Sequence, residues 1–258
     1  MRISSTILIL VGAVLLPYSC EGPPNGGRRT PTTTAIIDYD GNTYHTVKIG
    51  DQWWMTRNLE TTHYADGTEI PRVESTSAWD ALGSEDSAYC YYNNNSSNEA
   101  FTYGALYTWA AALNGAESSA NIPSGIQGVC PDGWHVPSDG EWKELEMDLG
   151  MPQSELDATG PRGLYIGSKL AASPSLWADG YLKDSDAFGI SKFKVLPGGG
   201  RHFDGTFEFL GENANFWSAT EGDSARAWVR HIYSKYTTVH RYKSIKSNGF
   251  SVRCVKDK

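Results

Sequence analysis

Residues 130–142 read CPDGWHVPSDGEW, and this short stretch predicts how the middle of the chain folds. The Pro-Asp-Gly that follows the cysteine is a turn sequence, and the later proline disfavours helix in the residue before it. Ser138 and Glu141 have the spacing of a capping box, in which each side chain accepts a hydrogen bond from the other residue's backbone amide. We therefore expect a short extended segment over 134–136 and a helix that begins after Ser138.

The expected helix buries one face. Trp142, Leu145 and Leu149 fall at positions i, i+3 and i+7, and Gly150 is a stop signal. The acidic residues of the first turn suit the positive end of the helix dipole, so they have a structural role. His135 has no Cys or His nearby at ligand spacing, and we interpret it as structural rather than as a metal ligand or catalytic group.

The composition predicts a globular domain rich in aromatic residues. Of 258 residues, 40% are hydrophobic and 12% aromatic, which is enough for a sizeable core, and 27 glycines allow many tight turns. The formal net charge is −8 and is spread along the chain. Because phosphate binding needs a basic face, this balance argues against nucleic acid as a partner and against simple adsorption to anionic lipid.

The N-terminus has the features of a bacterial lipoprotein signal. Residues 7–16 are a short apolar run that suits a signal peptide and is too short to span a bilayer. Cys20 follows at the place where a lipoprotein carries the cysteine that takes a diacylglycerol. Pro17 stands where such signals usually have Leu, so ordinary cleavage near Ser19 stays an alternative. We expect a lipoprotein signal peptide over 1–19 and lipidation of Cys20, which anchors a protein without spanning the membrane.

The remaining chain divides into a linker and one folded part. Residues 20–35 are rich in Pro, Gly and Thr, which is typical of a flexible tether. The folded domain is expected over 36–258. Hairpin turns are expected within 36–55 and at Asp204-Gly205, a glycine bend at 198–200, and three closing strands near the C-terminus.

A second helix is expected over 102–116. Four apolar residues between Leu106 and Leu113 fall at i, i+3, i+4 and i+7, which places them on one face. Asn114-Gly115 is a stop signal for this helix.

Several motifs in order resemble the Fibrobacter succinogenes major paralogous domain (FISUMP), a family common in lipoproteins of Fibrobacter and Bacteroidetes. The stretches that carry the resemblance are DYDGNTYHTVKIGDQWWMTRNLETTHYADGTEIP, AYCYYNNN, YGALYTWAAA, CPDGWHVPSDGEW, LPGGGRHFDGTF, FWSAT and GFSVRCVKD. The resemblance covers nearly all of 36–258 and implies one α+β domain with a divergent C-type lectin-like fold. That fold would have short twisted antiparallel sheets, two main helices and long loops.

The resemblance also implies a disulfide between Cys130 and Cys254, which agrees with the oxidising compartment of an exported protein. Cys90 is then left over. Its setting, Tyr-Cys-Tyr-Tyr, favours a buried inert thiol, with pairing to Cys130 or Cys254 as the alternative. No cationic residue adjoins Cys90 in sequence to activate it as a nucleophile.

Calcium binding is weakly indicated. The Glu-Pro-Asn or Gln-Pro-Asp and Trp-Asn-Asp motifs of calcium-dependent lectins do not occur in the sequence. Glu212, Asn213 and Asn215 supply suitable oxygen atoms in a different order, and they are the candidate ligands for a calcium ion. No other cofactor or metal is expected.

Aromatic and amide side chains on expected loops are the candidate ligand-binding residues, because sugar C–H faces lie on rings while amides and acids bond hydroxyls. The alternative is that these rings pack inside their own domain. The candidates form two clusters, Tyr91, Tyr92, Asn93, Asn94 and Asn95, and Trp177, Asp179 and Tyr181.

The sequence therefore favours a non-enzymatic binding or adhesion module on the outer membrane, facing the periplasm or the cell surface. Its partners would be the membrane, through the N-terminal lipid, and a glycan or surface protein. One alternative is an enzyme with a site like that of the sulfatase-modifying oxidases or of a glycosidase, which would need reactive cysteines or two opposed carboxylates. Another alternative is a structural component of a surface assembly.

Overall fold

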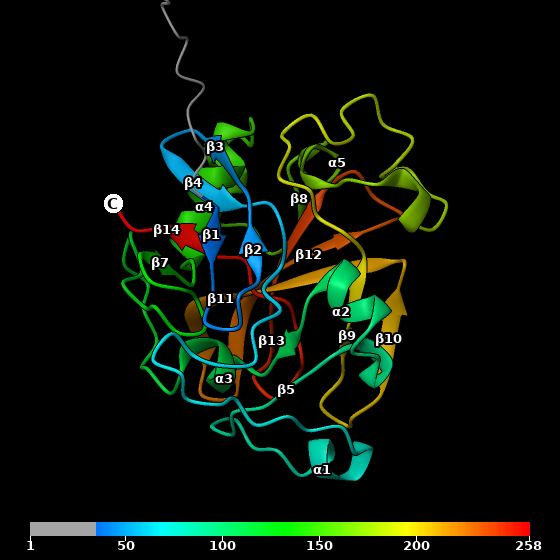
Figure 1. Cartoon of the computed structure of the whole chain (residues 1–258). Helices are drawn as coiled ribbons and strands as arrows, with labels where there is room; N and C mark the ends of the chain where they lie inside the picture. Colours follow the sequence, from blue (N-terminus) through cyan, green and yellow to red (C-terminus); the bar gives the residue numbers. More distant parts are fainter. Residues whose placement is uncertain (1–34) are drawn as a thin grey trace, which may run out of the picture. The chain divides into compact units, whose positions relative to one another are not determined.

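A six-stranded and a four-stranded sheet form the frame of residues 35–258, the part of the chain that the computed structural model describes (Figure 1). The strand order is β10-β9-β11-β12-β13-β8 in the larger sheet and β3-β4-β14-β7 in the smaller one. Helices and sheets are mixed, and the fold class is α+β, as predicted. The predicted signal peptide, Cys20 and nearly all of the predicted tether lie outside the described residues.

The strands are short except for three long neighbours in the larger sheet. Their bounds are β1 Ile36–Ile37, β2 Thr43–Tyr44, β3 Thr46–Ile49, β4 Gln52–Met55, β5 Tyr89–Cys90, β6 Leu106–Tyr107, β7 Trp134–His135, β8 Gly160–Arg162, β9 Gly198–Arg201, β10 Phe207–Leu210, β11 Asn213–Asp223, β12 Arg226–Tyr233, β13 Val239–Ile245 and β14 Val255–Lys256.

The helices are also short, and α4 is the longest of those described. Their bounds are α1 Thr76–Asp80, α2 Asn98–Tyr103, α3 Trp109–Leu113, α4 Asp139–Asp148 and α5 Ile166–Leu170, with 3-10 turns at Tyr92–Asn94, Gln153–Glu155 and Pro174–Leu176. Within residues 35–258, no helix is long and apolar enough to cross a membrane.

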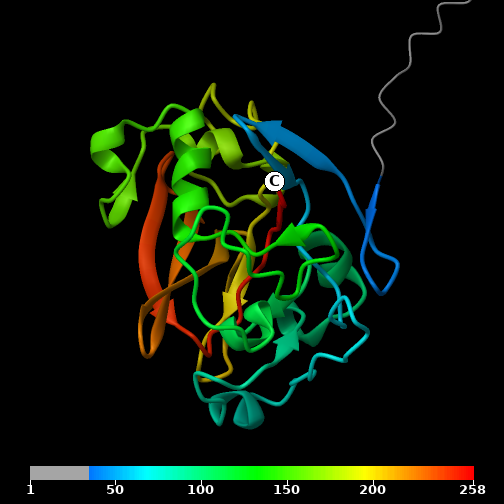
Figure 2. The ribbon, with the colours of Figure 1, turned by 90° about the vertical axis from the view of Figure 1, so that its left-hand side faces the viewer.

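Alternation of side chains along β11 gives the larger sheet two different faces. Ala214 and Phe216 belong to the hydrophobic cluster that also contains Trp142 of α4. Figure 2 shows α4, in green, beside the orange strands of this sheet. Asn213 and Asn215 therefore point to the opposite face of the sheet.

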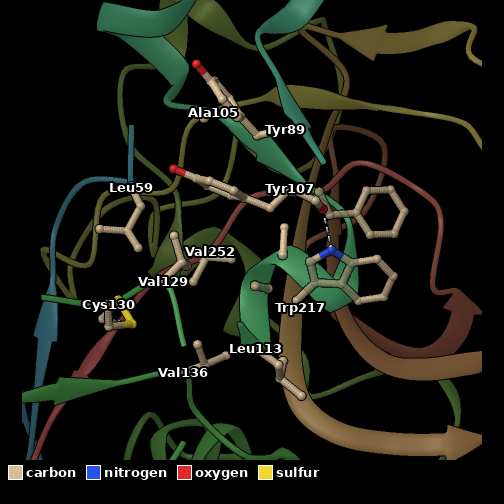
Figure 3. Close-up of a cluster of buried hydrophobic side chains, with 14 of the residues drawn as sticks. Leu59, Tyr89, Ala105, Tyr107, Leu113, Val129, Cys130, Val136, Trp217 and Val252 are labelled. Atoms are coloured by element: carbon tan, nitrogen blue, oxygen red, sulfur yellow. Dashed lines mark hydrogen bonds between the residues drawn. A yellow bond between two sulfur atoms is a disulfide. The ribbon is translucent and has the colours of Figure 1, made fainter. Parts of the chain in front are cut away.

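The opposite face of β11 continues into a second hydrophobic cluster (Figure 3). Trp217 is fully buried, and its indole Nε1 donates a hydrogen bond of 2.8 Å to the Tyr107 carbonyl oxygen. Burying a side chain of this size contributes about 3 kcal/mol of hydrophobic free energy. The disulfide between Cys130 and Cys254 lies in the same cluster and confirms the implied pairing.

The capping box at the start of α4 is confirmed. Ser138 Oγ accepts from the Glu141 amide at 3.1 Å, and Glu141 Oε2 accepts from the Ser138 amide at 3.0 Å. The other carboxylate oxygen of Glu141 lies 2.7 Å from His135 Nε2, and Asp257 lies 2.6 Å from His135 Nδ1. Burial lowers the pKa of His135, but these two carboxylates outweigh burial and leave the pKa raised. His135 thus joins α4 to the C-terminal segment.

A buried ion cluster joins α4 to β12 and β13. Arg230 Nε lies 2.6 Å from Glu146 Oε1, and Arg230 Nη1 lies 2.7 Å from Asp139 Oδ1. Arg241 Nη2 lies 2.8 Å from Asp139 Oδ2. Arg162 Nη2 completes the cluster, 2.7 Å from Glu146 Oε2. The α4-facing side of the larger sheet is therefore held by paired charges as well as by apolar contacts.

The single helix predicted over 102–116 is wrong, because the segment is broken at Gly104. Gly104 has φ +80°, and a Cβ at this position would lie 2.5 Å from the Leu59 carbonyl oxygen. The next residues form β6, which pairs with β5, and only α3 remains helical after it. The predicted apolar face is buried all the same, because the surrounding core covers both pieces.

The glycine bend predicted at 198–200 is also wrong, because these residues belong to strand β9. A Cβ on Gly200 would lie 2.9 Å from the Phe250 ring, and one on Gly199 would lie 2.4 Å from the Glu208 carbonyl oxygen. Glycine therefore lets β9 lie against close neighbours. The predicted hairpin across Asp204-Gly205 is confirmed by the pairing of β9 with β10.

Candidate functional site

A polar pocket opens on the face of the larger sheet that points away from α4. Its volume is about 210 Å³. The pocket is built from β9, β10, β11, β12, β13 and the segment that follows β13. The lining residues are Gly200, Arg201, His202, Glu208, Phe209, Asn213, Asn215, His231, Tyr242, Ser244, Asn248 and Phe250.

Strand register brings the central side chains together. Asn215 of β11 pairs with His231 of β12, and Val229 of β12 pairs with Tyr242 of β13. Because side chains alternate along a strand, these residues all point to the same face of the sheet. The central side chains of the pocket thus come from three neighbouring strands rather than from one loop.

Two amide side chains at the pocket are buried without full hydrogen bonding. Asn213 and Asn248 are each 6% exposed, and the Oδ1 atom of each has no hydrogen-bond partner within residues 35–258. Asn248 Nδ2 donates to Ser244 Oγ at 2.8 Å. A buried polar group without a partner costs about 1–3 kcal/mol. Both unpartnered atoms are hydrogen-bond acceptors, which a group with polar hydrogens can satisfy.

A hydrogen-bond network holds the floor of the pocket. Asn215 Nδ2 donates to the Gly199 carbonyl oxygen at 3.2 Å, and the Tyr242 hydroxyl donates to Asn215 Oδ1 at 3.0 Å. His231 Nδ1 lies 3.4 Å from the same hydroxyl oxygen. Since that hydroxyl already donates to Asn215, it accepts from His231, which places the ring proton on Nδ1.

Two central side chains of the pocket, His231 and Tyr242, are uncharged at neutral pH. Burial, with a smaller contribution from His240, lowers the pKa of His231 to about 4, and burial raises the pKa of Tyr242 far above its usual value. The Arg201 guanidinium donates hydrogen bonds to the carbonyl oxygens of Val73, Glu74 and Gly205. The exposed carboxylate in the lining is Glu208.

The pocket rim carries an aromatic ring in a strained position. Phe209 is 50% exposed and has φ +62°, a left-handed conformation that bulky residues rarely adopt. Such strain costs of order 1–3 kcal/mol and concentrates at functional sites. Phe250 also lines the pocket and its ring lies against Gly200 of β9. The rim therefore offers apolar surface beside the polar floor.

We expect the His231→Gln variant to be less sensitive to acid than the wild type. The folded-state pKa of His231 is about 4, below its unfolded value of about 6.5. The unfolded chain therefore takes up the proton first, so stability is full above about pH 6.5 and falls as the pH drops towards 4.

Urea unfolding at about pH 7 and about pH 4.5 measures the effect. The wild type should lose more free energy of unfolding between the two pH values than the variant does. His45→Gln is the matched control, because His45 is exposed. Equal losses in the wild type and in His231→Gln would contradict the assignment.

The candidate calcium ligands are not brought together as one set. Asn213 and Asn215 line the pocket, whereas Glu212 does not. Asn215 Oδ1 is already occupied by the Tyr242 hydroxyl. Within residues 35–258 there is no group of three or more His, Cys, Asp or Glu that could hold a metal ion. Calcium prefers six to eight oxygen ligands, including carboxylates, and this arrangement does not supply them.

The first predicted aromatic cluster is largely turned inward. Tyr91 and Tyr92 are each 8% exposed, so their rings pack inside the protein. The three asparagines that follow are closer to solvent, with Asn93 exposed and Asn94 and Asn95 half-buried. The Asn94 amide nitrogen donates to the Glu74 carbonyl oxygen. The amides, not the rings, are the part of this cluster that a ligand can reach.

The second predicted cluster is divided. Trp177 is 3% exposed and its indole donates to the Ala172 carbonyl oxygen, so its ring cannot stack on a ligand. Tyr181 is 74% exposed and Asp179 is exposed. Tyr181 borders an open cleft of about 520 Å³ that also contains Tyr165.

Cys90 is free and buried, and burial raises the pKa of its thiol to about 12. It is therefore almost entirely protonated at neutral pH, which is the state of an inert thiol.

The sequence reasoning missed His231, Tyr242 and Asn248. Tyr242 and Ser244 stand at alternate positions of β13, which predicts that their side chains share one face. The order and register of the neighbouring strands decide whether side chains from β11, β12 and β13 meet at one pocket.

Comparison with known proteins identifies the family of the chain. No curated protein and no solved structure matches it. The family model described as the Fibrobacter succinogenes major domain (Fib_succ_major) matches residues 47–256. This match includes every strand of the larger sheet, all but the first residue of the smaller one, and all the residues that line the polar pocket. The chain therefore belongs to the Fibrobacter succinogenes major domain family.

Proposed function

We propose that the chain is a non-enzymatic binding module that recognises a carbohydrate in the polar pocket on β11, β12 and β13. The observation that carries the proposal is the pair of buried amides, Asn213 and Asn248, each with an unpartnered atom at the pocket. Sugar hydroxyls both donate and accept, so they satisfy an amide whichever way its oxygen and nitrogen are oriented.

The other properties of the pocket suit the same ligand class. The C–H face of a sugar ring lies well on an exposed aromatic ring, which Phe209 provides. The neutral side chains of His231 and Tyr242 suit an uncharged ligand, and the carboxylate of Glu208 can accept hydrogen bonds from hydroxyls. The volume of about 210 Å³ is smaller than that of most drug-sized ligand pockets. One sugar residue, at the end of a longer glycan, is the ligand that fits best.

The proposal includes the fold of the domain and its location at the outer membrane. A divergent C-type lectin-like fold is supported by the order of the sequence motifs and by the disulfide that joins Cys130 to the C-terminal strand region. Lipidation of Cys20 and an outer-membrane location are supported by the N-terminal sequence. A tether between lipid and domain would leave the pocket free to meet glycans in the periplasm or outside the cell.

Replacing Asn213 by Leu is expected to abolish sugar binding without destabilising the protein. Removing a buried polar group that has no partner is neutral or stabilising. The affinity of the variant for a ligand that hydrogen-bonds this amide should fall at least about tenfold. The purified full chain is first screened on a glycan array, with and without calcium. The best glycan is then titrated calorimetrically against the wild type and variants.

Asn121→Leu is the matched control, because Asn121 is exposed and lies outside the pocket. Thermal unfolding of each variant separates a binding defect from a folding defect. The proposal fails if no glycan on a broad array binds the wild type, or if Asn213→Leu binds as tightly as Asn121→Leu. Retention of a surface protein rather than a glycan would support the binding module but overturn the carbohydrate.

A further inference from the structure

A small second pocket within residues 35–258 has a basic lining that includes no Asp or Glu. Its volume is about 120 Å³, and its lining residues include Arg57, Lys194 and Arg253 together with the hydroxyl residues Thr102 and Ser173. The pocket shares no lining residue with the polar pocket of the proposed function.

Arg253 brings an uncompensated charge to this pocket. It is 1% exposed, and no Asp or Glu among residues 35–258 lies within ion-pair distance of it. Its hydrogen bonds go to neutral oxygens, namely Asn58 Oδ1 and the carbonyl oxygens of Phe193 and Lys194. Burial lowers the pKa of Arg253 to about 9, so the guanidinium keeps its charge at neutral pH.

Arg230 shows how the same fold treats another buried arginine. Arg230 is also 1% exposed, yet it contacts two carboxylates, Asp139 and Glu146. A buried charge without a counter-ion is costly even after the protein relaxes. The rings of Phe193 and Phe216 near the Arg253 guanidinium offset only part of that cost.

Hydrogen-bond donors remain free at the pocket. An arginine has five N–H donors, and four hydrogen bonds of Arg253 are accounted for, so one N–H on Nη1 is left. Lys194 is exposed and makes no ion pair with any residue in the described part of the chain. Arg57 is already paired with Glu60 at 2.8 Å. The excess positive charge therefore comes from Arg253 and Lys194.

The backbone holds two lining residues in unfavourable conformations. Lys194 has φ +64° and Ser173 has φ +55°, both in the left-handed region. A residue in such a conformation persists only where its surroundings hold it there. Here the fold fixes both residues beside the buried guanidinium.

We propose that this pocket binds an oxyanion group, such as a sulfate or phosphate, whose oxygens accept from Arg253, Lys194 and the neighbouring hydroxyls. A planar guanidinium and an ammonium are the side chains that recognise such groups. The group comes either as a free ion or as an ester on a larger molecule such as a sulfated sugar. The two sources share the chemistry of the bound group and differ in affinity.

The test is calorimetric titration of the purified full chain with inorganic sulfate, inorganic phosphate, glucose 6-sulfate and glucose. Ionic strength is held constant with sodium chloride, which controls for general salt effects. Lys194→Asn removes the rim charge and keeps a residue that tolerates positive φ. Lys192→Asn is the matched control, because Lys192 is an exposed lysine with φ +60° that lies outside the pocket.

The expected result is that at least one oxyanion binds the wild type and Lys192→Asn equally, and Lys194→Asn about tenfold more weakly. Tighter binding of glucose 6-sulfate than of inorganic sulfate identifies an ester as the source, and the reverse order identifies the free ion. The proposal is overturned if no oxyanion binds the wild type, or if Lys194→Asn and Lys192→Asn bind with the same affinity. Because the sugar pocket uses other residues, loss of glycan binding in Asn213→Leu leaves this result unchanged.

Discussion

The Cys130→Ala/Cys254→Ala double variant is expected to lose up to about 5 kcal/mol of unfolding free energy, because the disulfide closes a loop across 124 residues. A crosslink that closes a long loop restricts the unfolded chain more than a crosslink that closes a short loop. It also holds the segment before β14, the strand that pairs with both β4 and β7 in the smaller sheet. For a domain of this size, such a loss lowers the unfolding temperature by about 10–20 °C.

Thermal unfolding with and without a reducing agent measures this effect. Reduction should lower the unfolding temperature of the wild type to that of the double variant, and should leave the double variant unchanged. Cys90→Ala is the matched control, because Cys90 is free and its removal leaves the crosslink intact. A double variant that unfolds at the wild-type temperature would show that the crosslink contributes little to the folded domain.

Features encoded within a few residues were predictable from the sequence. The capping box needs only Ser138, Glu141 and their spacing, because both hydrogen bonds form within one helical turn. The hairpin between β9 and β10 needs only a turn sequence between two extended stretches. The pairing of Cys130 with Cys254 was different, since it came from resemblance to a family and not from any local spacing.

Features that depend on distant neighbours were not predictable. The helix expected over 102–116 has a good apolar pattern, yet Gly104 lies against the Leu59 backbone and the chain turns into a strand there. Propensity is a weak preference that tertiary contacts override. Trp177 likewise follows a polar loop sequence, but only the packed structure shows that its ring points into the core.

The residues of the polar pocket depend even more on contacts between distant parts of the sequence. Asn213 and Asn215 could be singled out in sequence for their oxygen atoms, whereas His231 and Tyr242 reach the pocket through strand register alone. A shift of one residue in that register would move their side chains to the other face of the sheet. Composition and spacing carry no information about such long-range pairing.

The Asp139→Asn variant is expected to destabilise the protein by about 3–5 kcal/mol, because it leaves two buried arginines without their shared carboxylate. Asp139 is 5% exposed and contacts both Arg230 and Arg241. Burial raises the pKa of Asp139, but the hydrogen bonds and charges of the two arginines outweigh it and hold the pKa well below its usual value. The ionised carboxylate is therefore the form that stabilises the folded state.

Urea unfolding near neutral pH measures the loss, with tryptophan fluorescence as the probe. Asp157→Asn is the matched control. Lys143 pairs with both Asp139 and Asp157, but the Asp157 side chain is 84% exposed, and exposed pairs contribute little. Replacing Asp139, Arg230 and Arg241 together by apolar residues should recover much of the lost free energy of unfolding. The loss in Asp139→Asn comes from unpaired buried charge rather than from lost side-chain volume. If Asp139→Asn were no less stable than Asp157→Asn, water or another carboxylate would have to compensate the two arginines, and the contrast between paired Arg230 and unpaired Arg253 would lose its energetic basis.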